Sequence, residues 1–322
     1  MQTAEVCDKI GKEIGICTVC VVGGLHRSIQ KKQLKKGADI VVATPGRLLD
    51  LTTEDDLSLN YIEFFVLDEA DRMLDMGFEK DIRAIADHLP EKKQTLMFSA
   101  TWPKSIQSIC NQYLVSPIKV TIGKADQLNA NRNIKQIVEV IDPKSRDARL
   151  RELLKMYHNG KNKVIVFVLY KKEASRIERM LRERGWNVQG LHSDKNQAQR
   201  TIAMNSFKCG QCPLLVATDV AARGVDIEDV EYVINYSFPL VMEDYVHRIG
   251  RTGRSGKLGT AHTFFTVFDK KHSGALIQLL KEAKQVVPPE ILKFGTAIQE
   301  KEPKIGKIEL NVECNDDHLI FN

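Results

Sequence analysis

One stretch of eight residues, Phe64 to Asp71, constrains the fold more than any other part of this chain. Its first four residues are apolar and predict a fully buried strand, which the carboxylates Asp68 and Glu69 follow without a spacer. In open α/β sheets, ligands bind beyond the carboxyl ends of the strands. Carboxylates at that position can hold a magnesium ion and prepare a water for attack on a phosphate. Because Asp and Glu also favour the first turn of a helix, an ordinary helix start is the alternative.

Apolar runs and helical patterns alternate along the first half of the chain, which predicts a parallel, doubly wound sheet. We expect strands at 17–22, 39–43, 64–67 and 94–98, and helices at 2–14, 26–36 and 78–88. Three of these strands lead into Gly23-Gly24, Thr44-Pro45-Gly46-Arg47 and Ser99-Ala100-Thr101. The hydroxyl and guanidinium of Thr44 and Arg47 suit contact with phosphate, although Pro-Gly is also common in ordinary turns. The two glycines permit a tight approach of the backbone, and hydroxyls such as those of Ser99 and Thr101 are often helix caps.

A polar run from Asp126 to Asn133 is the best candidate for a linker, because the alternation of strands and helices restarts after it. We therefore predict a first domain at 1–126, a linker at 127–136, a second domain at 137–284 and a C-terminal extension at 285–322. In the second domain we expect strands at 163–168, 187–191, 213–217 and 231–235, and helices at 172–184 and 197–207.

Two clusters of polar and charged residues stand out in the second domain. Thr218, Asp219, Arg223 and Asp226 follow the carboxyl end of the strand at 213–217. Farther along, the segment from His247 to Arg254 interleaves three arginines with glycines, a composition that no packed core uses. At helical spacing Arg251 and Arg254 would share one face, and guanidinium pairs of this kind grip phosphate oxygens. The alternative is a solvated basic loop.

Over about residues 1 to 300, the short motifs described above and their order along the chain resemble those of the DEAD-box ATP-dependent RNA helicases. The resemblance is carried by Gly23-Gly24, Thr44 to Arg47, Asp68 to Asp71, Ser99 to Thr101, Gln197 with Arg200, Thr218 to Asp226, and His247 to Arg254. It implies an α/β fold of two RecA-like parallel-sheet domains in tandem, which close on ATP and on an RNA strand. It also implies RNA backbone contacts with little sequence preference, and protein cofactors of RNA processing as further partners.

The resemblance further implies a role for individual residues. Asp68 would hold Mg²⁺ through water, and Glu69 would orient the attacking water. Arg251 and Arg254 would act as arginine fingers, and Asp226 would touch the ribose of ATP. The residues implied at the RNA backbone are Gly23, Gly24, Thr44, Pro45, Gly46, Arg47, Gln197, Arg200 and Thr218. The residues implied to couple hydrolysis to domain closure are Asp71, Ser99, Thr101 and His247.

The chain departs from the family where ATP phosphates would bind. A P-loop needs Gly-Lys followed by Ser or Thr, but the chain's five Gly-Lys pairs are followed by Glu, Ala, Asn, Leu and Ile. We therefore expect a first domain that is incomplete at its N-terminus, with a sheet side unpaired and apolar surface exposed. Smaller departures are Ser193, where the family usually has Gly, and Leu169-Tyr170, which replaces a more usual hydroxyl pair.

Two functions follow from these observations. The first is an ATP-dependent RNA helicase that couples ATP binding and hydrolysis to RNA binding and duplex unwinding. The second is a catalytically inactive RNA-binding or regulatory remnant, because the P-loop pattern is missing. A DNA helicase would share the RecA-like architecture, but the amino-acid sequences of the motifs at 68–71 and 247–254 argue against that function.

Composition limits the partners and the location. A net charge of +5 and a pI near 8.7 permit a nucleic-acid partner. No apolar run approaches the length of a membrane span, and the first residues lack an apolar signal core, so we expect an intracellular protein without a membrane partner. The segment from Val286 to Gly295 resembles relatives that work in ribosome assembly, which favours the nucleus or nucleolus over the cytoplasm.

Overall fold

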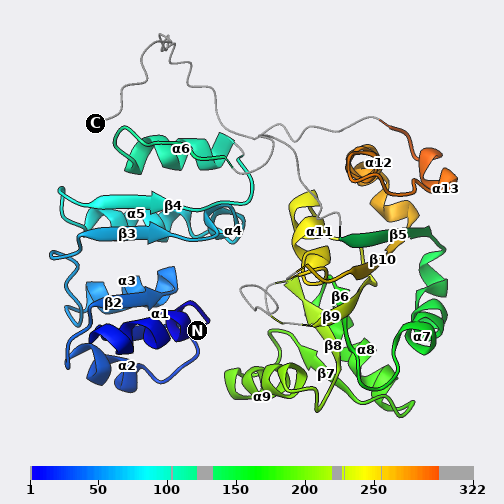
Figure 1. Ribbon diagram of the computed structural model, residues 1–322, viewed down its shortest axis with the longest axis horizontal. Helices are drawn as coiled ribbons and strands as arrows, with labels where there is room; N and C mark the ends of the chain where they lie inside the picture. The colour runs from blue at the N-terminus through cyan, green and yellow to red at the C-terminus, as the bar shows by residue number, and fades with distance from the viewer. Residues whose placement is uncertain are drawn as a thin grey trace, which may run out of the picture.

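The computed structural model shows two α/β domains that lie side by side (Figure 1). The structure describes residues 2–102, 104–121, 133–219, 227, 229–254 and 256–296. Every strand pair in this part of the chain is parallel, which confirms the predicted fold class. None of the helices described is long and apolar enough to cross a membrane.

Short strands alternate with helices in the first domain. Its elements are α1 (Gln2–Gly11), η1 (Lys12–Ile14), β1 (Thr18–Val21), α2 (Arg27–Leu34), β2 (Ile40–Ala43), α3 (Pro45–Thr53), β3 (Phe64–Leu67), α4 (Ala70–Asp75), α5 (Glu79–Asp87), β4 (Gln94–Met97) and α6 (Lys104–Tyr113). The helix expected at 2–14 therefore ends as an α-helix at Gly11 and continues as one 3₁₀ turn, which Gly15 closes in the left-handed conformation. Pro45 occupies the first turn of α3, where its missing N–H costs no hydrogen bond.

The strands of the first domain form two separate two-stranded sheets, β1–β2 and β3–β4. Each sheet has its own small apolar cluster, one around Val21 and Leu51 and the other around Leu67 and Ile106. The opposite face of β3–β4 is apolar as well but faces solvent: Phe64 is 61% exposed, and Val66, Leu96 and Phe98 are also exposed. The expected exposure of apolar sheet surface is thus confirmed for the residues described.

The second domain has a larger set of elements. They are β5 (Ile134–Val140), η2 (Pro143–Ser145), α7 (Arg146–Tyr157), β6 (Lys163–Val168), α8 (Lys171–Arg182), β7 (Val188–Leu191), α9 (Gln197–Lys208), β8 (Leu214–Thr218), β9 (Val230–Asn235), α11 (Met242–Ile249), β10 (Gly259–Phe265), η3 (Val267–His272), α12 (Ser273–Glu282) and α13 (Pro289–Leu292).

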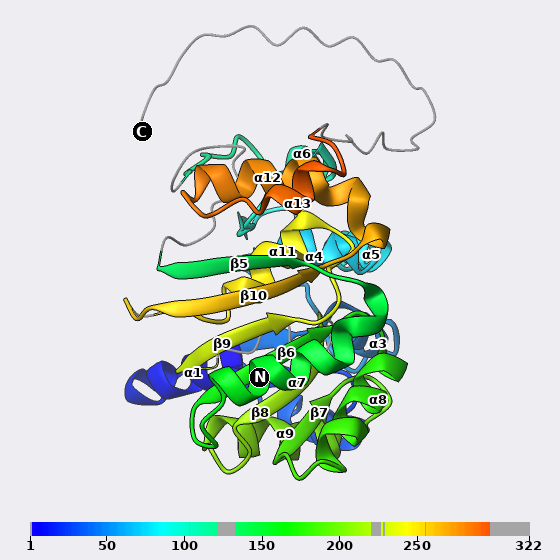
Figure 2. The ribbon, with the colours of Figure 1, turned by 90° about the vertical axis from the view of Figure 1, so that its right-hand side faces the viewer.

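Its six strands form one sheet in the order β5-β10-β9-β6-β8-β7 (Figure 2). Side chains of a strand alternate between the two faces of a sheet. Accordingly, Val164, Val166 and Val168 of β6 pack into one apolar cluster, and Ile165 and Phe167 pack into the other. Because both faces are covered, the central strands read as continuous apolar runs in the sequence.

Two of the predicted boundaries need correction. Residues 134–136 fall in the predicted linker but belong to β5, which pairs with β10 along its whole length. Residues 285–295 were assigned to the extension, yet Ile291 is fully buried in the second-domain core and Phe294 packs against it. Neither place shows a regular apolar period, because the buried position 136 of β5 is a glutamine and Pro288-Pro289 interrupt the second segment.

We predict that the two domains differ in local stability. Two-stranded sheets with an exposed apolar face are only marginally stable, whereas the six-stranded sheet is buried on both faces. In hydrogen exchange followed by mass spectrometry, amides of β1 to β4 should exchange about a hundredfold faster than those of β6, β8 and β9. The second domain of the same molecule serves as the control. Equal protection of both domains would contradict this interpretation.

Candidate functional site

The two predicted acidic residues lie where the sequence placed them, directly after β3. Both side chains are exposed, and an oxygen of the Asp68 carboxylate accepts a hydrogen bond from the Glu69 amide at 3.0 Å. Glu69 has φ 52° and ψ 48°, a left-handed conformation that non-glycine residues rarely adopt. Strain of this kind is concentrated at functional sites. The turn therefore presents two adjacent carboxylates to solvent at the carboxyl edge of the sheet.

Asp71 links the acidic turn to the end of β4. Its buried carboxylate accepts hydrogen bonds from the Thr101 amide at 3.0 Å and from the Thr101 hydroxyl at 2.8 Å. The Ser99 hydroxyl donates to the carbonyl of Thr101 at 2.7 Å, which fixes the turn after β4. The structure thus brings together three of the residues predicted to couple the domains.

Arg72, which the sequence analysis did not single out, makes a buried contact between the domains. Its guanidinium forms an ion pair with the Asp244 carboxylate on α11 of the second domain. The two side chains are only 5% and 11% exposed. Nearby on α11, burial and then the positive charge of Arg72 lower the pKa of His247, while the negative charge of Asp71 raises it. His247 therefore lies within the electrostatic field of the first domain.

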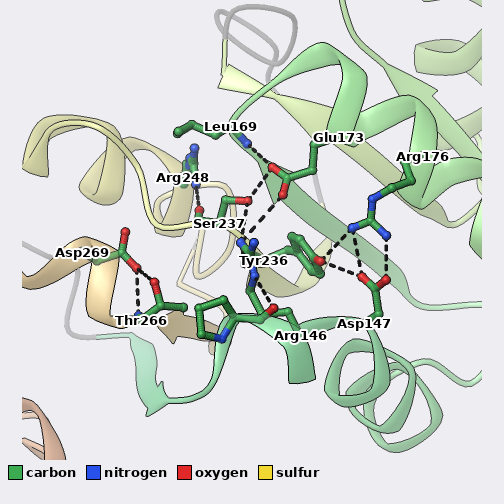
Figure 3. A network of polar contacts seen from close by, with 11 residues as sticks. Arg146, Asp147, Leu169, Glu173, Arg176, Tyr236, Ser237, Arg248, Thr266 and Asp269 are labelled. Atoms are coloured by element: carbon green, nitrogen blue, oxygen red, sulfur yellow. Dashed lines mark hydrogen bonds and ion pairs between the residues drawn. The ribbon is translucent and has the colours of Figure 1, made fainter.

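Arg248, one of the three arginines of the segment at 247–254, is a second functional candidate, for which the sequence analysis predicted no role; its burial corrects the expectation that this segment lies outside a packed core. Its side chain is fully buried, and its Nε and Nη2 atoms donate to the two oxygens of Asp219 at 2.6 and 2.7 Å. Asp219 directly follows Thr218 at the end of β8. A third donor of Arg248 reaches the carbonyl of Ser237 at 2.7 Å (Figure 3). The ion pair between Arg248 and Asp219 joins α11 to the end of β8, where an RNA contact is predicted. The sequence signal that could have predicted this pair was the presence of opposite charges at a strand end and near a helix end.

The predicted helical spacing of Arg251 and Arg254 is wrong. Helix α11 ends at Ile249, and Gly253 has φ 69°, so both arginines lie in the turn that follows. The turn is held by the buried Thr252, whose hydroxyl donates to the carbonyl of Glu231 at 3.1 Å. Both arginines are half-buried. Asp226, the predicted ribose contact, lies outside the described residues.

The predicted RNA contacts of the first domain form one edge. The Gly23 amide donates to the Thr44 hydroxyl at 3.3 Å, and the Arg47 guanidinium donates to the carbonyl of Leu25 at 3.2 Å. These contacts bring the turn after β1 against the start of α3, where Pro45 and Gly46 form the first helical turn.

The predicted RNA contacts of the second domain continue that edge. A Cβ atom on Gly24, which has φ 78°, would lie 3.4 Å from the Gln197 side chain, so the two domains approach each other closely here. Gln197 begins α9, and Arg200 lies one turn later. The Arg200 Nε is buried and has no hydrogen-bond partner among the described residues. Thr218 is buried at the end of β8.

A polar network fixes the ends of β6 and β9 beside this edge (Figure 3). Glu173 of α8 accepts from the Ser237 hydroxyl at 2.6 Å and from the Leu169 amide at 3.2 Å. Hydrogen bonds from Arg176 lower the pKa of Asp147, and burial, followed by the hydrogen bond to Asp147, raises the pKa of Tyr236 to about 12. At neutral pH the Asp147 carboxylate therefore stays ionised and the Tyr236 hydroxyl stays protonated, so Tyr236 can donate its hydrogen bond to Asp147.

Asp68 and Glu69 fit a magnesium ion that arrives with a nucleotide. Mg²⁺ keeps several waters and commonly takes one or two carboxylates together with phosphate oxygens. Two exposed adjacent carboxylates supply that donor set. No cluster of three His, Cys, Asp or Glu side chains that could hold a metal by itself occurs in the described ranges.

Comparison with known proteins gives the same class as the geometry. The DEAD/DEAH box helicase model matches residues 1–109, and the helicase conserved C-terminal domain model matches residues 145–256. The chain belongs to the DEAD-box ATP-dependent RNA helicase family.

Two curated relatives illustrate the similarity. DEAD-box ATP-dependent RNA helicase 5 of Oryza sativa is 54% identical over 306 residues, which cover 94% of this chain and 60% of the relative. ATP-dependent RNA helicase DBP3 of Saccharomyces cerevisiae is 54% identical over 294 residues, covering 90% of this chain and 56% of the relative. The chain thus spans somewhat more than half the length of these relatives.

Among solved structures, S. cerevisiae Dbp5 bound to RNA and ADP BeF3 superimposes with a TM-score of 0.74 at 28% identity. The match covers 92% of this chain and 72% of that one. The tandem arrangement of two RecA-like domains is therefore that of the DEAD-box helicases.

We predict that the ion pair between Arg72 and Asp244 holds the domains together. Asp244→Asn removes the carboxylate that faces a buried guanidinium, and breaking a buried pair costs about 3 kcal/mol or more. Fluorescence energy transfer between labels on the two domains should fall accordingly. Asp229→Asn is the control, because Asp229 pairs with Lys257 at an exposed site of the same domain. Unchanged energy transfer in Asp244→Asn would contradict a role in domain contact.

Proposed function

We propose that the protein is an ATP-dependent RNA helicase, which binds RNA across both domains and couples ATP hydrolysis to the contact between them. The observation that carries the proposal is the chain of contacts from Thr101 through Asp71 and Arg72 to Asp244. It connects the acidic turn of one domain to the helix that leads into the arginine turn of the other.

RNA would bind along the edge formed by the turns after β1 and β2 and by the start of α9. The buried, unpartnered Nε of Arg200 supports this assignment, because a buried donor without an acceptor is costly unless a ligand supplies one. Phosphate oxygens of an RNA backbone are such acceptors. Backbone contacts carry no sequence information, so binding would show little sequence preference.

The nucleotide would bind at the acidic turn. Asp68 would hold Mg²⁺ through water, and the bound ion would neutralise charge on the phosphates. Glu69 would orient a water molecule, and its left-handed backbone fixes the carboxylate in the turn for that purpose. Arg251 and Arg254 would stabilise charge on the transferring phosphoryl group, and Asp226 would touch the ribose.

The contacts between the domains would make hydrolysis depend on RNA. The arginine turn follows α11, which contacts Arg72 just after the acidic turn, and Arg248 ties the same helix to Asp219 next to Thr218. RNA bound at Thr218 would therefore stabilise the helix that positions the arginines. If the catalytic residues come together only when the domains are in contact, ATP is not hydrolysed while the domains are apart.

A catalytically inactive RNA-binding or regulatory remnant is the second candidate. It is favoured by one observation: none of the five Gly-Lys pairs has the Ser or Thr that a P-loop requires. Acidic and arginine residues accelerate phosphoryl transfer only when the phosphates are already held in place.

The pathway is a further part of the proposal. The resemblance of residues 286–295 to relatives in ribosome assembly supports a role in RNA or ribosome maturation, in the nucleus or nucleolus. Protein cofactors of RNA processing would be additional partners.

Arg200 gives a test of RNA binding. Arg200→Ala should weaken binding of single-stranded RNA by about the same factor for different sequences and reduce the slope of log affinity against log salt by about one. Arg179→Ala, an exposed arginine on α8, is the matched control. A change in sequence preference without a change in the salt slope would mean that Arg200 does not bind backbone phosphate.

Phosphate release tests catalysis. The 322-residue chain should show no RNA-stimulated ATPase activity, whereas a fusion with an upstream segment carrying Gly-x-Gly-Lys-Thr should show it. In that fusion, Glu69→Gln should lower the rate about a hundredfold or more, because the water loses its orienting base. Glu91→Gln, an exposed residue of the same domain, should not. Turnover by the unextended chain that Glu69→Gln abolishes would show that the chain needs no such segment.

A further inference from the structure

Tyr170 is an exposed aromatic residue at the carboxyl end of β6. The residue is 63% exposed and occupies the N-cap position of α8 in an extended conformation, without a side-chain capping hydrogen bond. Within the described part of the chain, the Tyr170 ring contacts no other ring and its hydroxyl makes no hydrogen bond. An aromatic side chain held in solvent at a strand end is available to a ligand.

Tyr170 lies close to the second-domain residues that are proposed to contact RNA. In the sheet, Val168 of β6 pairs with Thr218 of β8, so Tyr170 lies two residues beyond the position of a predicted RNA contact. Lys171 forms an ion pair with Asp194 at 2.8 Å, which joins the start of α8 to the turn just before Gln197. Tyr170 therefore lies on the same edge as the second-domain RNA contacts.

The electrostatics of this edge favour a polyanion. Helices α8 and α9 each have twelve residues and begin here, and helix N-termini attract phosphate. At the start of α8, Lys172 adds a positive charge, while Asp194 offsets the charge of Lys171 and the carboxylate of Glu173 is occupied by Ser237 and Arg146. A phosphate backbone that follows these helix ends would pass beside the Tyr170 ring.

A hydrogen bond of the preceding residue fixes the backbone next to Tyr170. The amide of the preceding residue, Leu169, donates to Glu173, which the Ser237 hydroxyl and Arg146 hold in place (Figure 3). A ring presented from a fixed backbone loses little conformational freedom when it stacks on a ligand. Tyr170 thus combines an exposed ring with a rigid support.

We propose that Tyr170 stacks on a nucleobase of the single-stranded RNA, adding an aromatic contact to a set of residues that otherwise bind the backbone. The proposal rests on the proposed RNA binding of the second domain. Because every base has a π-face, stacking raises affinity while leaving sequence preference weak.

Fluorescence anisotropy with two oligonucleotides tests the proposal on the full chain. One is an oligoadenylate, and the other is an abasic ribose-phosphate strand of the same length. Tyr170→Ala should weaken binding of oligoadenylate about tenfold, within the range measured for one stacked base, and leave binding of the abasic strand unchanged. Tyr170→Phe keeps the ring and should bind both strands as the unmodified chain does.

Two controls separate this inference from the proposed function. Tyr61→Ala removes a tyrosine that is 91% exposed and precedes the amino end of β3, so it should bind both strands normally. Arg200→Ala should weaken binding of both strands. If Arg200→Ala does so but Tyr170→Ala has no effect, or weakens both strands equally, stacking is disproved while RNA binding stands. If the unmodified chain binds neither strand, both proposals fail.

Discussion

The relation between the two domains depends on a contact between buried charges. Arg72 and Asp244 are removed from water together, and burying either one alone would be strongly unfavourable. The pair is therefore made only when both domain surfaces meet. Because Arg72 follows Asp71 and Asp244 lies on α11, the contact fixes the acidic turn and the arginine turn relative to each other. Electrostatic complementarity of this kind specifies an orientation more than it adds affinity.

Both domains place their functional side chains by the same geometry. Parallel strands carry their carboxyl ends at one edge, and the helices that follow begin there. Carboxylates, hydroxyls and guanidiniums from distant parts of the chain consequently gather at one edge in each domain. In the second domain, six strands and the network around Glu173 hold that edge rigidly. In the first, two small sheets with an exposed apolar face hold it.

The sequence alone determined the order and type of most elements, and the residues at the strand ends. Periods of two and of 3.6 residues are local properties, so strands such as 163–168 and the carboxylates that follow Phe64 to Leu67 could be predicted from neighbouring residues. The roles of Asp71 and Thr101 came from the family resemblance, and their hydrogen bond is seen only in the structure, where the parallel pairing of β3 with β4 brings them together.

Tertiary structure decided which distant residues are partners. Arg72 and Asp244 are 172 positions apart, and Arg248 and Asp219 are 29 apart, so no local pattern could pair them. Arg251 and Arg254 lie in a turn because α11 ends at Ile249, and in that turn Gly253 adopts a positive φ and Thr252 is buried. Strand β5 and the packing of Ile291 were likewise hidden, because edge segments are specified by the surface they cover rather than by their own periodicity.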